Sequence, residues 1–197
     1  PLSGGLTVQA RTGTKDDGQP ELTCFIVEKD TPGLSIKAMH GKLMWKASDT
    51  AEVYLDNVEV PDENIVGEVG GGSRQMLTAL DYGRLGIAAM ALGHAQGAYD
   101  LALAYAKDRV QFGKPLSKHQ AIAFKLADMA TEIDLSRTYL YQAAKMRDEG
   151  LPYTKQAAMA KLYCTEMAGR VTDASIQIHG GYGLMNEYDV ERLWRDQ

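Results

Sequence analysis

The sequence predicts an α+β protein in which a partial antiparallel β domain, residues 1–68, precedes an antiparallel four-helix bundle, residues 69–197. The first part contains β-rich runs between turn residues and shows no helical period, whereas from about residue 73 apolar residues recur at helical spacing. The charge changes at the same place. Residues 1–68 hold 6 Lys or Arg against 12 Asp or Glu, and residues 69–197 hold 15 against 14.

About four antiparallel strands, forming part of a larger sheet, are expected between Leu6 and Val66. The run Leu22–Asp30 is rich in β-forming residues and ends at a DTPG turn signal. The run Ala51–Pro61 alternates apolar and polar residues, with a turn or bulge expected at Asp56 and Asn57. The TKDDGQPE stretch is expected to form a loop or a hairpin tip. Some sixty residues are few for a closed β domain, so further strands are expected upstream.

Four helices are expected after GEVGGGS, Gly67–Ser73, which reads as a flexible joint. Gly113 and Pro115 end the first helix, and SKHQ, Ser117–Gln120, has the form of a capping box for the second. Long helices with short connections favour an antiparallel bundle. The expected helices cover about 73–110, 117–149, 153–178, and 186 to the end.

A stripe of glycines follows one face of the first predicted helix. Gly83, Gly86, Gly93 and Gly97, with Met90 between them, recur at alternating spacings of three and four residues. Each glycine in a helix interior costs about 1 kcal/mol relative to alanine. Two explanations stay open: tight packing against another helix, and close approach of a flat ligand.

Composition excludes several function classes. A net charge of −5 without basic runs does not suit nucleic acid or anionic membranes, and no apolar run is long enough to span a bilayer. Cys24 and Cys164 lie far apart, so a reducing compartment is expected. The four dispersed histidines and the absence of HExxH, zinc-ligand or GxSxG patterns predict no metal centre or serine-hydrolase site.

Three stretches carry residues suited to ligand binding. In Ile176–Leu184, paired glycines allow close backbone approach to an anion or flat ring, although a plain helix C-cap is the alternative. In Asp108–Gln120, Arg109 offers a forked cation for phosphate and Phe112 a ring face, although an ordinary corner between helices is the alternative. Asp81 and Arg84 form either a surface ion pair or a site for polar ligand groups.

Taken together, these stretches resemble the acyl-CoA dehydrogenase family over nearly the whole chain. The resemblance rests on FIVEKDTPGL, VYLDNVEVPDENIVGE, LDYGRLGIAAMALGHAQGAYDLALAYAKDRVQFGKPLSKHQAIAFKLADM and IQIHGGYGLMNEYDVERLWRD, with Ser175 where the family writes Ala. It implies the later part of a middle β domain and most of a C-terminal four-helix bundle. It also implies FAD-dependent oxidation of acyl-CoA thioesters to trans-2-enoyl-CoA, homodimers or homotetramers, and electron-transfer flavoprotein as partner.

The resemblance also implies which residues bind the cofactor and the substrate. The family's RxxFG corner and QIxGG segment contact FAD across a subunit interface, and the segment matching LDYGR lies near the acyl-CoA thioester. The implied FAD-binding residues are Arg109, Gln111, Phe112, His119, Gln120, Gln177, Ile178, His179, Gly180 and Gly181. The implied substrate-binding residues are Asp81, Tyr82, Gly83 and Arg84.

No catalytic residue is assigned. A minority of the family carries its base at the position of Gly83, which has no carboxyl group, so the base is expected as a Glu beyond Gln197 and the chain alone is expected to be inactive. Short or medium acyl chains are the expected substrates, and DYGRLGIA favours short or branched short ones. An acyl-CoA oxidase-like flavoenzyme and a non-catalytic interaction or scaffold module are the alternatives. The expected compartment is the cytoplasm of a bacterium or the mitochondrial matrix of a eukaryote.

Overall fold

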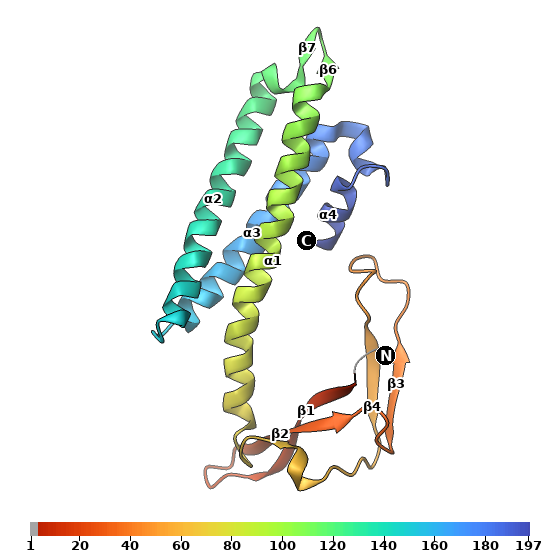
Figure 1. Cartoon of the computed structure of the whole chain (residues 1–197), viewed down its shortest axis with the longest axis vertical. Helices are drawn as coiled ribbons and strands as arrows, with labels where there is room; N and C mark the ends of the chain where they lie inside the picture. The colour runs from red at the N-terminus through yellow and green to blue at the C-terminus, as the bar shows by residue number, and fades with distance from the viewer. Residues whose placement is uncertain (1–3) are drawn as a thin grey trace. The chain divides into compact units, whose positions relative to one another are not determined.

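A computed structural model describes residues 4–197. The chain forms two compact units, one ending at Leu80 and one comprising Asp81–Gln197. Antiparallel strands come first and helices follow, which confirms the predicted α+β class (Figure 1). Helix α1, Gly72–Asp108, contributes its first residues to the first unit and the rest to the second. The domain boundary expected at residues 68 and 69 stays a prediction.

The strands of the first unit lie in two sheets rather than in the one that the sequence predicts. One sheet has the order β1-β2-β5 and the other pairs β3 with β4, and every pairing is antiparallel. Strand β4 ends at Leu55 because Asn57 adopts a left-handed backbone conformation, with φ of 51°. The strands are β1 Gly5–Thr14, β2 Pro20–Glu28, β3 Leu34–Ala38, β4 Ala51–Leu55 and β5 Ile65–Val66.

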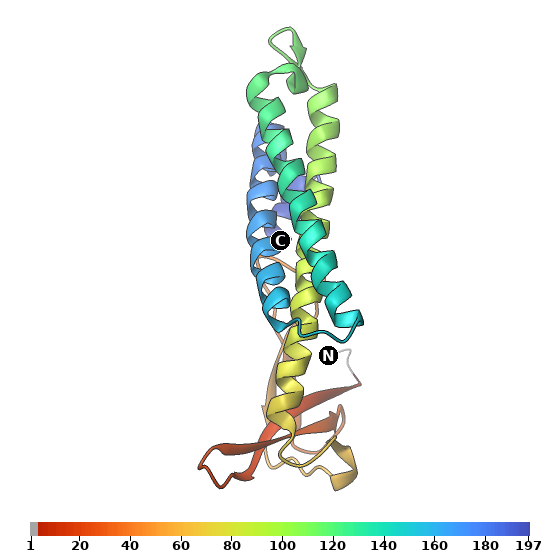
Figure 2. The same cartoon turned by 90° about the vertical axis from the view of Figure 1, so that its left-hand side faces the viewer.

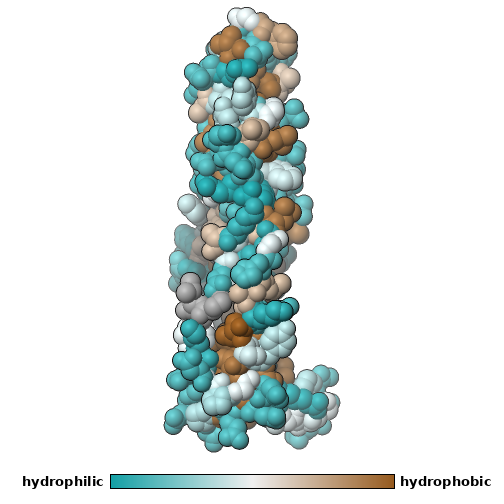
Figure 3. Space-filling model, turned by 90° about the vertical axis from the view of Figure 1, so that its right-hand side faces the viewer, coloured by the Kyte–Doolittle hydropathy of each residue, from teal (hydrophilic) through white to brown (hydrophobic). Residues whose placement is uncertain are grey.

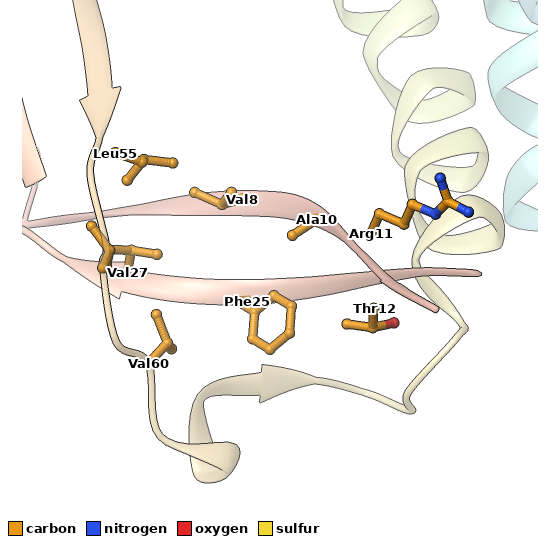
Figure 4. Close-up of a pocket in the computed structure, with 9 residues that line it drawn as sticks. Val8, Ala10, Arg11, Thr12, Phe25, Val27, Leu55 and Val60 are labelled. Carbon is orange, nitrogen blue, oxygen red and sulfur yellow. The ribbon is translucent and has the colours of Figure 1, made fainter. Parts of the chain in front are cut away.

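The first unit leaves an apolar face open. Cys24 and Val27 are the buried hydrophobic residues among the described strands of this unit. Beside them lies a pocket of about 360 Å³ (Figure 4). Alternation along β1 and β2 directs Val8, Ala10, Phe25 and Val27 to the face that holds the pocket, and Cys24 to the opposite face. The pocket is lined by Val8, Ala10, Arg11, Thr12, Phe25, Val27, Leu55, Val58 and Val60.

The glycine-rich segment before α1 packs on β2, which corrects the prediction of a flexible joint. The Gly70 N–H donates a hydrogen bond to Thr23 Oγ1 at 2.9 Å. A Cβ atom at Gly72 would lie 2.7 Å from the Leu22 carbonyl oxygen. Glycine is therefore needed at Gly72 because the start of the helix touches the strand backbone.

The second unit is built on three long helices and a short fourth one. Besides α1 these are α2 Gln120–Asp148, α3 Thr154–His179 and α4 Val190–Asp196. Both views show α1, α2 and α3 side by side (Figures 1 and 2). The buried residues of α2 recur every three or four positions, as in helical bundles. They are Leu126, Met129, Ile133, Ser136, Leu140 and Ala143.

The stripe on α1 that packs in the core consists of alanines with Leu85 and Leu92, and contains no glycine. A Cβ atom at Gly83, Gly86 or Gly93 would meet no described atom within 4 Å, and one at Gly97 would meet only Leu193 Cδ1 at 3.5 Å. The prediction of tight packing at the glycines is therefore wrong for the first three within this chain. The buried alanines of α1 are Ala88, Ala91, Ala95, Ala98, Ala102 and Ala106.

Two helix starts differ from the sequence prediction. The capping box does not form, because Ser117 lies inside a 3-10 turn and α2 begins at Gln120. His119 is the N-cap residue, with extended backbone and no capping hydrogen bond from its side chain. Helix α4 begins at Val190, four residues after the expected start, since turns occupy the intervening segment.

The surface shown in Figure 3 mixes hydrophobic and hydrophilic residues, with hydrophobic ones in separate patches. Of the helices in residues 4–197, none combines the length and the apolar character that a membrane crossing requires. In the same range, His, Cys, Asp and Glu side chains form no group of three that could hold a metal ion.

Candidate functional site

A two-strand hairpin projects where α1 ends. Strands β6, Val110–Gln111, and β7, Lys114–Pro115, pair across Phe112 and Gly113, whose φ angles are 52° and 80°. Two consecutive positive φ angles are typical of a type I′ turn, which glycine adopts freely and phenylalanine rarely does. Phe112 is also 92% exposed, so a residue with a strained backbone conformation holds its aromatic ring in solvent.

The hairpin is joined to the start of α2 by His119. Its Nε2 atom lies 3.1 Å from the Gln111 carbonyl oxygen, and its ring meets Phe112 edge to face at 6.0 Å. Gln120 is exposed at the first position of α2. The hairpin and the start of α2, both within Asp108–Gln120, are therefore joined by contacts of one side chain, His119.

The glycine pair after α3 forms a helix cap, as one of the two sequence readings expects. Gly180 has φ of 61°, and its N–H donates to the carbonyl oxygens of Gln177 and Ile176. This N–H is thus used within the chain. Gly183 lies buried in the following 3-10 turn, where a Cβ atom would be 2.8 Å from the Ile176 carbonyl oxygen.

The structure brings the corner and the end of α3 together around one pocket of about 570 Å³. Phe112, His119 and Gln120 do not line this pocket, although His119 is hydrogen-bonded to Gln111, which does. The lining includes no Asp or Glu among the described residues. The predicted cofactor residues that line the pocket are Arg109, Gln111, Gln177, Ile178, His179, Gly180 and Gly181.

The aromatic rings of Tyr105, His179 and Tyr182 line part of the pocket. Tyr105 stacks on His179 with ring centroids 4.4 Å apart, and Tyr188 meets both rings edge to face near 6 Å. The Arg109 guanidinium lies 5.8 Å from the centroid of the Tyr182 ring. Burial raises the pKa of the Tyr105 phenol, and the Arg109 cation opposes that shift. Tyr105 is therefore a neutral ring at physiological pH.

Sequence reasoning missed several residues of this pocket. Tyr105 lies one helical turn before Arg109, and that spacing is the signal that points to it. Tyr182 lies within the HGGYG motif itself. The remaining lining residues that were not predicted are Leu116, Ile122 and Met185, which no local pattern distinguishes from ordinary core positions.

The predicted substrate segment forms a separate cluster. Asp81 Oδ2 accepts a hydrogen bond from Thr154 Oγ1 at 2.5 Å, and Asp81 Oδ1 pairs with Arg84. Only 15% of the Asp81 side chain is exposed, so this is more than a surface ion pair. Tyr82 meets Tyr153 edge to face at 6.3 Å, and burial raises the pKa of Tyr153. Gly83 lies exposed beside them.

The two candidate sites do not meet within this chain. Arg84 and Tyr105 are 21 residues apart on α1, which corresponds to about 30 Å at a rise of 1.5 Å per residue. The chain therefore presents a ligand pocket at one end of α1 and a paired polar cluster toward the other.

The residues that line the pocket indicate a nucleotide-binding class of protein. A forked cation, amide side chains and aromatic faces around an apolar hollow can bind a nucleotide-like ligand through its phosphate and its ring. The described residues fit the FAD that the sequence resemblance implies, because they supply groups for both parts of a dinucleotide.

Comparisons with known proteins identify the family. A family model described as "Acyl-CoA dehydrogenase, C-terminal domain" matches residues 70–197. The chain is 51% identical over 191 residues to the probable acyl-CoA dehydrogenase YngJ of Bacillus subtilis (strain 168), covering 97% of this chain and 50% of that protein. The chain belongs to the acyl-CoA dehydrogenase family.

Solved structures agree with this assignment. Butyryl-CoA dehydrogenase from Megasphaera elsdenii matches with a TM-score of 0.93 and 44% identity, over 98% of this chain and 50% of that chain. A chain from a study of the electron transferring flavoprotein of Acidaminococcus fermentans matches with a TM-score of 0.93 and 41% identity, over 98% and 51%. The chain spans about half the length of the relatives it matches.

Proposed function

We propose that the protein carrying this chain is an FAD-dependent acyl-CoA dehydrogenase that converts acyl-CoA thioesters to trans-2-enoyl-CoA. The observation that carries the proposal is the convergence of two motifs, separated by more than sixty residues, on one pocket. Membership of the family supports the same conclusion. Short or branched short acyl chains are the proposed substrates, in line with the DYGRLGIA stretch and the butyryl-CoA named for one relative.

FAD is the proposed ligand of the pocket. Arg109 would hold the pyrophosphate as a forked donor, and the Gln111 and Gln177 amides would add hydrogen bonds. The Tyr105 and Tyr182 rings would contact the adenine. Phe112, His119 and Gln120 stand at the exposed corner, where they would contact the same cofactor beyond the pocket. The bound flavin would supply the hydride acceptor for the β-hydrogen.

The acyl-CoA is proposed to lie near the Asp81–Arg84 segment. There Asp81 and Thr154 hold Arg84 and the start of α3 together, which would fix the orientation of Arg84 toward polar substrate groups. Since about 30 Å of helix separates the two sites, each cofactor would bridge two copies of the chain. This geometry supports a homodimer or homotetramer with FAD at the subunit interface.

The reaction needs a carboxylate that removes the α-proton of the thioester. The chain has glycine at position 83, and the nearby carboxylate of Asp81 is held by Arg84 and Thr154. The 197-residue chain by itself is therefore proposed to be inactive. Electron-transfer flavoprotein is the proposed electron acceptor, in line with the electron transferring flavoprotein of Acidaminococcus fermentans named for one similar structure. The proposed compartment is the cytoplasm of a bacterium or the mitochondrial matrix of a eukaryote.

A colour change tests the proposal. The purified protein that carries this chain should be yellow, and its flavin absorbance should bleach when butyryl-CoA is added without oxygen. A protein that stays colourless when supplied with FAD contradicts the dehydrogenase and leaves the scaffold alternative. Peroxide release without an added acceptor would instead identify an oxidase.

A further inference from the structure

We propose that His179 recognises the adenine of the bound cofactor, with its Nε2 atom accepting a hydrogen bond from the exocyclic amino group. This inference rests on the proposed FAD function. It assigns a role to a side chain, whereas the family resemblance concerns the backbone of this segment.

The hydrogen bond at the other ring nitrogen determines which atom is the acceptor. His179 Nδ1 lies 2.8 Å from the carbonyl oxygen of Ser175. A carbonyl oxygen can only accept, so Nδ1 must carry the hydrogen. In a neutral imidazole the second nitrogen then keeps its lone pair and is an acceptor. The hydrogen bond of His179 that is described within residues 4–197 is made by Nδ1, which leaves Nε2 for a ligand.

The surroundings of His179 hold the ring in one orientation. Tyr105 stacks on it with an interplanar angle of 25°, and Tyr188 meets it edge to face. Ser175 is itself tied to α1 by a 2.8 Å hydrogen bond from its Oγ to the Ala98 carbonyl oxygen. His179 is only 5% exposed, yet it lines the pocket. The acceptor is thus fixed before any ligand arrives, which favours selective binding.

The other polar side chains of the pocket do not give the same selectivity. The amides of Gln111 and Gln177 each carry a donor and an acceptor, so either can turn to match an amine or a carbonyl group. The His179 ring cannot turn without breaking the bond to Ser175. A purine with an amino group is therefore matched, whereas one with a carbonyl oxygen at the same position would place two acceptors together.

The inference is tested by comparing the affinities of two dinucleotides for the protein that carries this chain. FAD and its analogue with hypoxanthine in place of adenine differ at the recognised position, where a carbonyl oxygen replaces the amino group. After removal of bound flavin, fluorescence titration should give about tenfold tighter binding of FAD than of the analogue. In His179→Phe, which keeps a stacked ring without an acceptor, the two dissociation constants should agree within about threefold.

His94→Phe is the matched control. His94 also bonds a carbonyl oxygen four residues earlier through Nδ1, that of Met90 at 3.1 Å, but it does not line the pocket. This variant should keep the tenfold preference. Circular dichroism verifies that each variant folds, and His179→Leu replaces the Phe variant if that one does not.

The outcomes separate this inference from the proposed function. Equal binding of both dinucleotides by the unmodified protein, or a tenfold preference that persists without His179, overturns the role of His179 while FAD binding stands. Failure of the unmodified protein to bind FAD overturns the proposed function, and the inference with it.

Discussion

The two ends of the helical unit differ in how their polar groups are satisfied. Toward the start of α1, Asp81 is engaged by both Arg84 and Thr154, so this cluster is complete within the chain. At the other end, Arg109 has no carboxylate partner among residues 4–197 and contacts the Tyr182 ring instead. The first cluster therefore stabilises the fold by itself, whereas the second leaves a cation and aromatic ring faces available to a ligand.

The largest effect is expected from Gly183→Ala, which tests whether the turn after α3 shapes the pocket. The new Cβ atom would lie 2.8 Å from a backbone oxygen, so the turn must shift, and we expect a loss of about 2 kcal/mol in the free energy of unfolding. Gly181→Ala is the control, because nothing lies within 4 Å of its Cβ position. Urea denaturation followed by circular dichroism measures both. Equal stability of the two variants would show that the turn is not tightly packed.

The helices and the pocket motifs could be predicted because both are local. The approximate positions of the helices follow from apolar residues every three or four positions, and the end of the first helix follows from Gly113 and Pro115, whereas the hairpin there was not predicted. Residues that meet only in three dimensions were not predictable. The contact of Tyr105 with Tyr188 depends on how α3 and the following turns return to α1, which no local pattern states.

The sequence also misled at specific positions. The SKHQ stretch satisfies the capping-box pattern, yet a 3-10 turn moves the helix start to Gln120. The glycine stripe indicates close packing, but alanines fill that role in the core while Gly83, Gly86 and Gly93 face no described neighbour. Spacing alone places residues on one face of a helix, and it does not say what covers that face.

A smaller effect on the free energy of unfolding is expected from a substitution in the Asp81–Arg84 cluster near the start of α1. Asp81→Asn removes the charge that Arg84 pairs with while keeping a similar shape, and we expect it to lower the free energy of unfolding by about 1 kcal/mol. FAD affinity should not change, because Asp81 does not line the pocket. Asp134→Asn is the control, since that carboxylate is 84% exposed and lies 3.9 Å from its partner. A loss of FAD binding in Asp81→Asn would contradict the separation of the two ends.

The smallest effect concerns Cys164, which lies in the core between the two ends. Burial raises the pKa of its thiol above the ordinary value of 9.0, and Ser136 opposes this shift. The folded state therefore holds the proton more tightly than the unfolded state, so stability should decrease slightly as the pH rises above 9. Urea midpoints at pH 8 and pH 10 measure it. The decrease should shrink in Cys164→Ala, and an equal decrease would assign the effect to other groups.

FAD retention in Arg109→Ala tests the central claim, that the pocket at the end of α1 binds the cofactor. The control is Arg170→Ala, which removes an arginine of the same unit that pairs with Glu132 outside this pocket. After gel filtration of the protein that carries the chain, Arg109→Ala should retain less than about a tenth of the flavin, as the loss of a forked phosphate contact implies. Arg170→Ala should retain all of it. Unchanged flavin content in Arg109→Ala would contradict the account.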